Sequence, residues 1–196
     1  VLLGLFPLIA RKIVEMVQKR KVYAQWAAVR PSTFDRNLVV IGAGAAGLVT
    51  SYIAAAVKAK VTLVESHKMG GDCLNYGCVP SKALIKSARI AHQMRHAELF
   101  GLHAVAPAFS FRQVMARVRN VIGAVAPHDS VERYTALGVE VLQGHARIID
   151  PWTVEVTLND GQPGTRVQRL TTRSIVIAAG ARPFVPPLPG LSEVGY

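Results

Sequence analysis

Residues 38–65 read LVVIGAGAAGLVTSYIAAAVKAKVTLVE, and this stretch decides the fold. A short β-branched run at 37–42 ends in glycine, residues 45–59 have the length and alanine content of a helix, and 60–65 read as a second buried strand. A strand, a helix and a strand in this order predict a βαβ unit with parallel strands. We therefore expect an α/β protein from residue 36 onward.

The turn between the first strand and the helix has the sequence GAGAAG. Gly42 allows the tight turn, Gly44 lets the backbone approach a pyrophosphate, and Gly47 lets the helix pack closely on the strand. The helix N-terminus then presents free N–H groups and a partial positive charge to a diphosphate. The candidate cofactor-binding residues of this loop are Gly42, Ala43, Gly44, Ala45, Ala46 and Gly47.

Glu65 ends the second strand, at the point where a carboxylate can accept hydrogen bonds from ribose hydroxyls. Its negative charge would repel a 2′-phosphate. Together with the glycine loop, Glu65 indicates a dinucleotide-binding site. The loop alone does not distinguish FAD from NAD.

Residues 69–90 read MGGDCLNYGCVPSKALIKSARI and contain both cysteines of the chain, Cys73 and Cys78. Two unrelated buried thiols are one alternative. In an ideal helix, Cα atoms five residues apart are separated by roughly 8.6 Å, which exceeds the ~7 Å limit for a disulfide. A bridge therefore requires a distorted first turn, which Gly77 and Pro80 would permit. Such a bridge closes a very small loop and would be labile and redox-active.

The segment GGDCLNYGCVPSKAL resembles the GGTCxxxGCxPSK signature of the flavoprotein disulfide reductases, or pyridine nucleotide-disulfide oxidoreductases. This family includes dihydrolipoamide dehydrogenase, glutathione reductase and mercuric reductase. The resemblance implies FAD for the glycine loop, Cys73 as the interchange thiol that meets the substrate, and Cys78 as the charge-transfer thiolate against the flavin. It places Lys82 near the flavin N5 edge, and a helix N-terminus beside a cation stabilises a thiolate.

Asp72 departs from the family signature, because the better-known members carry Thr at its position. Its carboxylate would either disfavour an anionic reduced flavin or point to water or to a nearby donor. We expect Gly71 and Asp72 to border the cofactor. Redox potential and substrate preference both depend on this departure.

The rest of the chain continues the resemblance. Residues 109–126 have helical spacing, and 129–138 read as a short helix with Asp129 as its N-cap. A strand at 138–148 carries the family's G-x-A pattern in Gly144 and Ala146, so the resemblance places adenine at the backbone of Ala146, next to His145.

Strands at 152–158 and 165–170 flank the turn NDGQPG and predict an antiparallel meander. Residues 174–190, SIVIAAGARPFVPPLPG, resemble the family's second FAD signature, hhhATGxxP. Ala178, Ala179 and Gly180 stand for its Ala-Thr-Gly. The predicted fold is an FAD/NAD(P)-binding Rossmann-like three-layer α/β domain over 36–196, composed of a parallel sheet, helices and an antiparallel β-meander.

The formal net charge of +11 is concentrated at the amino end, where residues 1–36 carry +5. Residues 1–10 are almost wholly apolar and a basic helical stretch follows them. Ten residues are too few for a bilayer span, which needs about 20, and a signal peptide would place its charges first. Three alternatives remain open for 1–35: the end of a membrane segment with a basic flank, an amphipathic helix on a partner or lipid surface, and a helix that covers the domain's own core.

Partners and location follow from these patterns. Zinc-finger spacing and RNP-like aromatic runs are absent from the sequence, so we expect no nucleic-acid partner. The basic flank resembles the juncture in bacterial proteins that join a membrane domain to a mercuric reductase-like domain. We therefore expect a cytoplasmic chain with a membrane tether on its N-terminal side, on the cytoplasmic face of a bacterial inner membrane. The family resemblance implies a homodimer for the full-length protein.

Several other residues attract attention. His67 and Lys68 follow Glu65, where they would touch the adenosine half of FAD. His128 and Asp129 suggest catalysis less than they suggest a helix start. Packing roles are expected for Met69, Trp26 and Trp152.

The resemblance implies a relay in which NAD(P)H reduces FAD, electrons pass through Cys78 to open the disulfide, and Cys73 meets Hg(II), a disulfide or another small oxidant. Both thiols are candidate Hg(II) ligands, and no structural metal is expected. The nicotinamide-binding and dimerisation domains are expected beyond residue 196, so this chain alone should hold FAD weakly and lack turnover. A redox-sensing or FAD-binding module without turnover is the alternative function.

Overall fold

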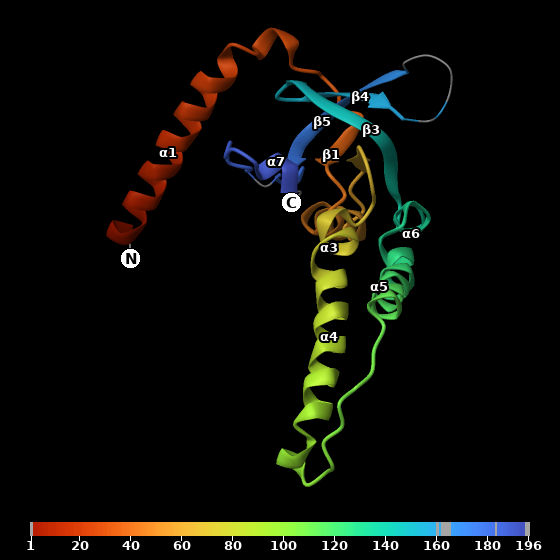
Figure 1. Cartoon of the computed structure of the whole chain (residues 1–196). Coiled ribbons are helices and arrows are strands. Elements are labelled where there is room, and N and C mark those ends of the chain that lie inside the picture. The colour runs from red at the N-terminus through yellow and green to blue at the C-terminus, as the bar shows by residue number, and fades with distance from the viewer. Residues whose placement is uncertain (1, 160, 162–165, 183, 195–196) are drawn as a thin grey trace.

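Five strands built from the β-branched runs of the sequence pair into one closed, mixed sheet (Figure 1). The computed structural model describes residues 2–159, 161, 166–182 and 184–194. The strands are β1 (Arg36–Ile41), β2 (Val61–Glu65), β3 (Val139–Asp150), β4 (Thr153–Leu158) and β5 (Val167–Ile177).

Parallel pairing joins β1 to both β2 and β5, and β2 to β3. Antiparallel pairing joins β4 to β3 and to β5. The long strands β3 and β5 therefore belong to both the parallel and the antiparallel part of the sheet. The start of β3 pairs with β2 and its end pairs with β4. The start of β5 pairs with β4 and its end pairs with β1. The strand predicted at 165–170 continues to Ile177 as the single strand β5, which includes the start of the segment 174–190. The predicted turn at 159–164 lies largely outside the described residues.

Two cores lie on opposite faces of the parallel sheet. Successive side chains of a strand point to opposite faces, so Val40 and Leu63 enter a core on the helix side. Their neighbours Val39 and Val64 enter a second core, which the meander covers. All four are buried. This arrangement confirms the predicted three-layer, Rossmann-like architecture.

Helices α2 (Ala45–Ala56) and α6 (Val131–Ala136) cover the helix side, where they contribute Leu48, Ala55 and Tyr134 to the core. Met69 also packs against this core, as predicted. The predicted N-cap at Asp129 is wrong. The Ser130 hydroxyl accepts the hydrogen bond from the Arg133 N–H (3.2 Å), and Asp129 lies in the preceding 3-10 turn η3 (Ala126–Asp129).

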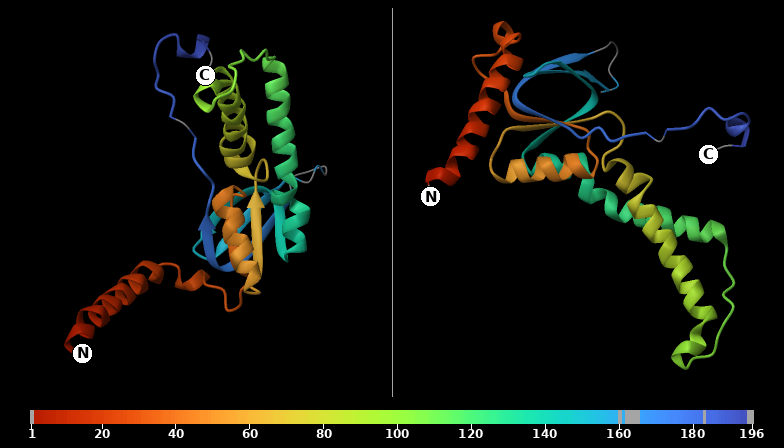
Figure 2. Two further views of the ribbon diagram at one scale, coloured as in Figure 1. Left: turned by 90° about the horizontal axis from the view of Figure 1, so that it is seen from below. Right: turned by 90° about the vertical axis from the view of Figure 1, so that its left-hand side faces the viewer.

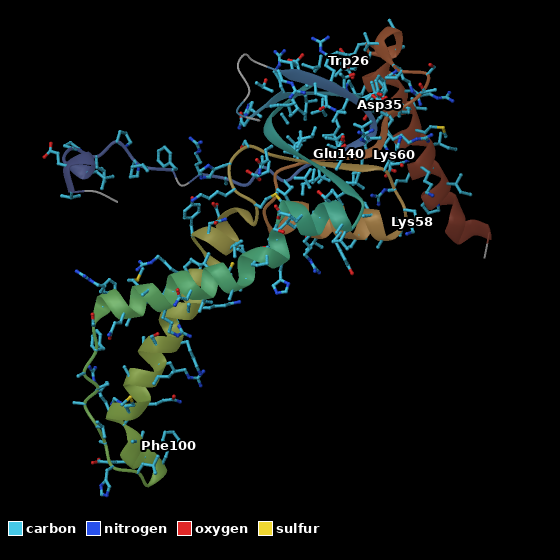
Figure 3. All side chains as sticks on the ribbon, turned by 90° about the vertical axis from the view of Figure 1, so that its right-hand side faces the viewer. Trp26, Asp35, Lys58, Lys60, Phe100 and Glu140 are labelled. Atoms are coloured by element: carbon cyan, nitrogen blue, oxygen red, sulfur yellow. The ribbon has the colours of Figure 1, made fainter. Side chains whose placement is uncertain are left out.

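A helical hairpin extends away from the sheet (Figures 1 and 2). The short helix α3 (Gly71–Asn75) leads into α4 (Cys78–Arg95), and the chain returns through η2 (Ala97–Phe100) and α5 (Phe111–Val125). Figure 3 labels Phe100 at the far tip. The Arg117 guanidinium on α5 donates to the Ala83 carbonyl on α4 at 2.7 Å, which fastens the two helices near the base of the hairpin.

The amino-terminal helix α1 (Leu2–Ala24) stands apart from the sheet and connects to it through η1 (Ala27–Val29) (Figure 2). The Tyr23 ring contacts the Trp152 ring, with centroids 5.5 Å apart. Side chains from Arg11 to Ala24 are exposed, so α1 does not cover the domain's own core. Within the described residues, no helix combines the length and apolar character that a membrane span requires. Four residues near the carboxyl end form α7 (Leu191–Val194).

A polar network ties the amino end of β1 to β2 and β3. The Arg36 guanidinium pairs with the Glu140 carboxylate at 2.6 Å, and both side chains hydrogen-bond to the buried Thr62 hydroxyl. Burial alone would raise the pKa of Glu140, but the hydrogen bonds from Thr62 and Arg36 outweigh it and lower the pKa. Lys60, labelled beside Glu140 in Figure 3, lowers the pKa further.

We expect Glu140→Gln to reduce the free energy of unfolding by about 1 kcal/mol near neutral pH, because the charged hydrogen bonds are lost from a partly exposed site. A lowered pKa stabilises the folded state above the ordinary carboxyl range, and that stabilisation is lost as the pH falls below it. The difference in the free energy of unfolding between parent and variant, measured by urea unfolding, should therefore be smaller at about pH 4 than at about pH 7. Glu98→Gln on the exposed η2 is the control. An equal difference in the free energy of unfolding at both pH values would contradict a stabilising role of the charged Glu140 carboxylate.

Candidate functional site

The carboxyl ends of β1, β2 and β5 open into one cavity of about 760 Å³, the position where open α/β sheets bind ligands. Most of the predicted cofactor-binding residues line it. They are Gly42, Gly44, Ala45, Ala46, Glu65, Gly71, Asp72, His145, Ala146, Ala178, Ala179 and Gly180. Cys73, His67 and Lys68 line it as well.

Four predicted site residues lie outside the cavity wall: Ala43, Gly47, Cys78 and Lys82. Sequence reasoning missed several lining residues, among them Ser66, Tyr76, Ala181 and Arg182. Ser66 and Arg182 come soon after the carboxyl ends of β2 and β5, where loops of parallel sheets meet ligands. That position was the available signal for both.

Each of the three loop glycines has a different steric environment. Gly42 has φ +103°, and a Cβ there would overlap the Ala178 carbonyl. A Cβ on Gly47 would overlap the carbonyl oxygen of Gly42. A Cβ on Gly44 would meet only the Gly71 Cα, at an ordinary 3.9 Å. Packing therefore requires glycine at 42 and 47, whereas Gly44 borders open cavity space, as close approach of a ligand to the backbone would need.

The amino end of α2 points its unsatisfied backbone donors toward this cavity. Its N-cap is Gly44, which offers no side chain to cap the first-turn N–H groups. Ala45 and Ala46, the first two helical residues, line the cavity. Free N–H groups and the helix dipole thus favour an anion, such as a diphosphate, at this position.

Glu65 has backbone partners as well as a place in the cavity wall. One carboxylate oxygen accepts the Ala43 N–H at 2.6 Å, and the other accepts the His67 N–H at 2.8 Å. The carboxylate therefore fixes the glycine loop and the turn after β2. Each oxygen has a further lone pair, so the predicted contact with ribose hydroxyls remains a prediction.

The cysteine segment has the distortion that a bridge requires. Cys73 lies in α3 and Cys78 begins α4, while the helical path breaks at Tyr76 and Gly77, whose N–H groups both donate to the Asp72 carbonyl (2.9 and 2.6 Å). Both cysteines are free thiols; Cys73 is half-buried and Cys78 exposed. The hydrogen bond with Cys78, followed by burial, raises the pKa of Cys73, whereas the charge of Lys82 lowers it. Cys78 and Lys82 thus act in opposite directions on the protonation of Cys73.

The cysteine segment sits directly on the glycine loop. The Gly70 N–H donates to the Ala43 carbonyl at 2.9 Å. Gly71 packs against Gly44 so closely that a Cβ on Gly71 would lie 2.7 Å from the Gly44 Cα. This contact brings Cys73 into the same cavity wall as the glycine loop. The structure does not place Cys78 in that wall, so its contact with the flavin remains a prediction.

Two carboxylates add negative charge near the dithiol. Asp72 lines the cavity, and no group in the described part of the chain donates to its carboxylate. Burial raises the pKa of Asp129, and the charge of Asp129 in turn raises the pKa of Cys73. Lys82 acts in the opposite direction. The protonation of the dithiol therefore depends on opposing charges.

Residues 36–196 match the family described as pyridine nucleotide-disulphide oxidoreductase. The chain belongs to this family.

Among curated relatives, the chain is 30% identical over 163 residues to a mercuric reductase of Bacillus cereus, a match that covers 83% of this chain and 24% of that protein. It is 36% identical over 159 residues to a dihydrolipoyl dehydrogenase of Mycoplasma pneumoniae, covering 80% and 32%. A mercuric reductase of Acidithiobacillus ferrooxidans is 36% identical over 165 residues, covering 83% and 29%. The chain thus spans roughly a quarter to a third of the length of these relatives.

Family membership explains why the glycine loop and the cysteine segment lie in contact. The family's members are FAD-dependent oxidoreductases, and the predicted relationship to mercuric reductase and dihydrolipoamide dehydrogenase is confirmed. The match begins at residue 36, so α1 lies outside it.

Gly47→Ala should lower the free energy of unfolding by about 2–3 kcal/mol, because its Cβ meets backbone that has to move. Gly44→Ala should leave stability nearly unchanged, since its backbone (φ −77°) suits any residue and space is open. Thermal and urea unfolding of the two variants checks this contrast. Equal losses of stability would contradict the division of the loop into packing and ligand-facing glycines.

Cys78→Ala should lower the pKa of Cys73, because the hydrogen bond with Cys78, which favours the protonated Cys73 thiol, is the largest influence that raises this pKa. Lys82→Met should raise the pKa of Cys73, since a stabilising cation is removed. The pH dependence of Cys73 alkylation, followed by mass spectrometry, reports both changes. A midpoint that stays fixed in Cys78→Ala would contradict this influence of Cys78 on Cys73.

Proposed function

We propose that this chain is the FAD-binding, dithiol-bearing portion of an NAD(P)H-dependent flavoprotein reductase. The observation that supports this proposal most directly is the backbone contact between Gly70–Gly71 and Ala43–Gly44, which puts Cys73 in the wall of a dinucleotide-sized cavity. The substrate is Hg(II) or a disulfide, the two classes to which the names of the relatives point.

The residues present fit an FAD dinucleotide. The uncapped N-terminus of α2 would hold the diphosphate, Glu65 the ribose, and the backbone at His145 and Ala146 the adenine. Ala178, Ala179 and Gly180 close the opposite side. Bound FAD would supply the two electrons, received from NAD(P)H, that pass through Cys78 to reduce a Cys73–Cys78 disulfide to the dithiol.

The reduced dithiol then carries out thiol–disulfide exchange. The Cys73 thiolate attacks one sulfur of a substrate disulfide, and the substrate's other sulfur leaves as a thiolate that takes up a proton. The Cys78 thiolate next attacks the Cys73 sulfur, which re-forms the bridge and releases the second substrate thiol. With Hg(II), the same two thiolates serve as ligands, since soft metal ions prefer thiolate sulfur. Lys82 stabilises the negative charge in both steps.

Gly44→Ala should weaken FAD binding by about tenfold, equivalent to ~1.4 kcal/mol, because a methyl group intrudes where the backbone meets the diphosphate. Gly123→Ala is the matched control, since Gly123 lies in α5 with open space around it and outside the cavity. Titration of the purified chain with FAD, followed by flavin fluorescence, measures both. Equal affinity in parent and Gly44→Ala would argue against FAD in this cavity.

A redox-sensing module without turnover is the second candidate, and the exposure of Cys78 favours it. The longest protein that contains this sequence discriminates between them. Oxidation of NADPH or NADH that depends on Hg(II), lipoamide or glutathione disulfide, and that disappears in Cys73→Ser, supports the reductase. Reversible oxidation of the dithiol without such turnover supports the module.

A further inference from the structure

The helix α1 carries a concentration of positive charge that the redox site does not use. Its only acid is Glu15, which pairs with Arg11 at 3.0 Å. The other cations of the helix, Lys12, Lys19, Arg20 and Lys21, have no ion pair with any residue that the structure describes, and all four are exposed. The helix stands away from the sheet (Figure 2), so this charge faces solvent.

An apolar face runs along the same helix. Ile9, Ile13, Met16 and Val17 recur at spacings of three and four residues, which places them on one side. Their exposed fractions lie between 47% and 54%, so nothing in the described chain covers them. Arg11, Glu15 and Lys19 share a different face by the same rule. The helix therefore exposes an apolar side between Ile9 and Val17, and Arg20 continues that side toward the inner end of the helix.

A second feature lies at the inner end of α1. A cleft of about 590 Å³ separates the helix from the turn between β3 and β4. Its lining residues are Lys19, Arg20, Tyr23, Ala24, Ala27, Arg30 and Trp152. The Arg30 guanidinium lies 5.6 Å from the centre of the Trp152 ring, which also contacts the Tyr23 ring. Three cations thus border two amphipathic aromatic side chains.

We propose that α1 and the cleft at its base dock on a bilayer surface that contains anionic phospholipid. The apolar face of α1 lies at the boundary between headgroups and acyl chains, while Lys19, Arg20 and Arg30 meet lipid phosphates. The exposed Tyr23 lies at headgroup level, where such side chains are enriched, and the buried Trp152 supports its ring from the domain side. A nucleic acid would match the cations but would leave the exposed apolar face without a partner. This proposal is independent of the redox function.

Flotation of the chain with vesicles tests the docking. Binding to vesicles of phosphatidylglycerol and phosphatidylcholine, and weaker binding to phosphatidylcholine alone or at high salt, is the expected result. Reversal of the three cleft cations in K19E/R20E/R30E should weaken partitioning by about a hundredfold. The control K86E/R89E/R95E makes the same charge change on exposed positions of α4 and should bind like the parent. Equal weakening in both would show nonspecific attraction and overturn the proposal.

The apolar half of the proposal has its own measurement. Trp26 and Trp152 are the only tryptophans, and both lie near the inner end of α1. Trp152 is buried and Trp26 is partly exposed, so the fluorescence of Trp26 should shift to the blue and be quenched by brominated acyl chains in anionic vesicles. I13N/V17N should reduce this quenching. Circular dichroism checks that both variants keep the parent's fold. Binding to a short DNA duplex without binding to vesicles, or release from vesicles by inorganic phosphate at constant ionic strength, would overturn the proposal.

Discussion

The rest of the site depends on the two backbone hydrogen bonds of Ala43. Its N–H is bound by the Glu65 carboxylate from the end of β2, and its carbonyl accepts the Gly70 N–H from the start of the cysteine segment. The Ala43 side chain is fully buried in the helix-side core. Ala43 thus connects the glycine loop, the Glu65 carboxylate and the cysteine segment. A displacement of this loop would move all three parts of the site at once. A Cβ at Gly42 or Gly47 would force such a displacement, because it would overlap a backbone carbonyl.

The same constraint determines the chemistry that the dithiol can perform. Because the segment is held at Gly70 and Gly71, α3 has room for only five residues before the chain breaks and α4 begins at Cys78. The break allows the approach of two thiols that a continuous helix would separate. Asp129 raises the pKa of Cys73, and Lys82 opposes it. Asp72 adds a carboxylate to the cavity wall, so local charge acts on this centre together with the path of the backbone.

The sequence predicted those parts of the site that rest on local backbone rules. The βαβ unit, the roles of Gly42 and Gly47, and the distorted turn between Cys73 and Cys78 follow from short-range sterics, and the structure agrees. The continuity of β5 was missed, because its bend depends on pairing with β4 and β1, which are distant in sequence. Asp129 was taken for the N-cap because Asp and Ser cap equally well. Only tertiary packing decides that Ser130 does so.

The parallel sheet also keeps the cavity and the cleft at Trp152 at opposite ends of the domain. The glycine loop follows the carboxyl end of β1, whereas the Thr172 N–H, beside Arg36 at its amino end, donates to the Trp152 carbonyl at 2.8 Å. Since β1 is six residues long, the cavity and the cleft at Trp152 are separated by about 20 Å of strand. A surface that binds the basic end of the domain therefore contacts neither the glycine loop nor Cys73. The two sites can be occupied together, because the parallel sheet keeps them at opposite ends.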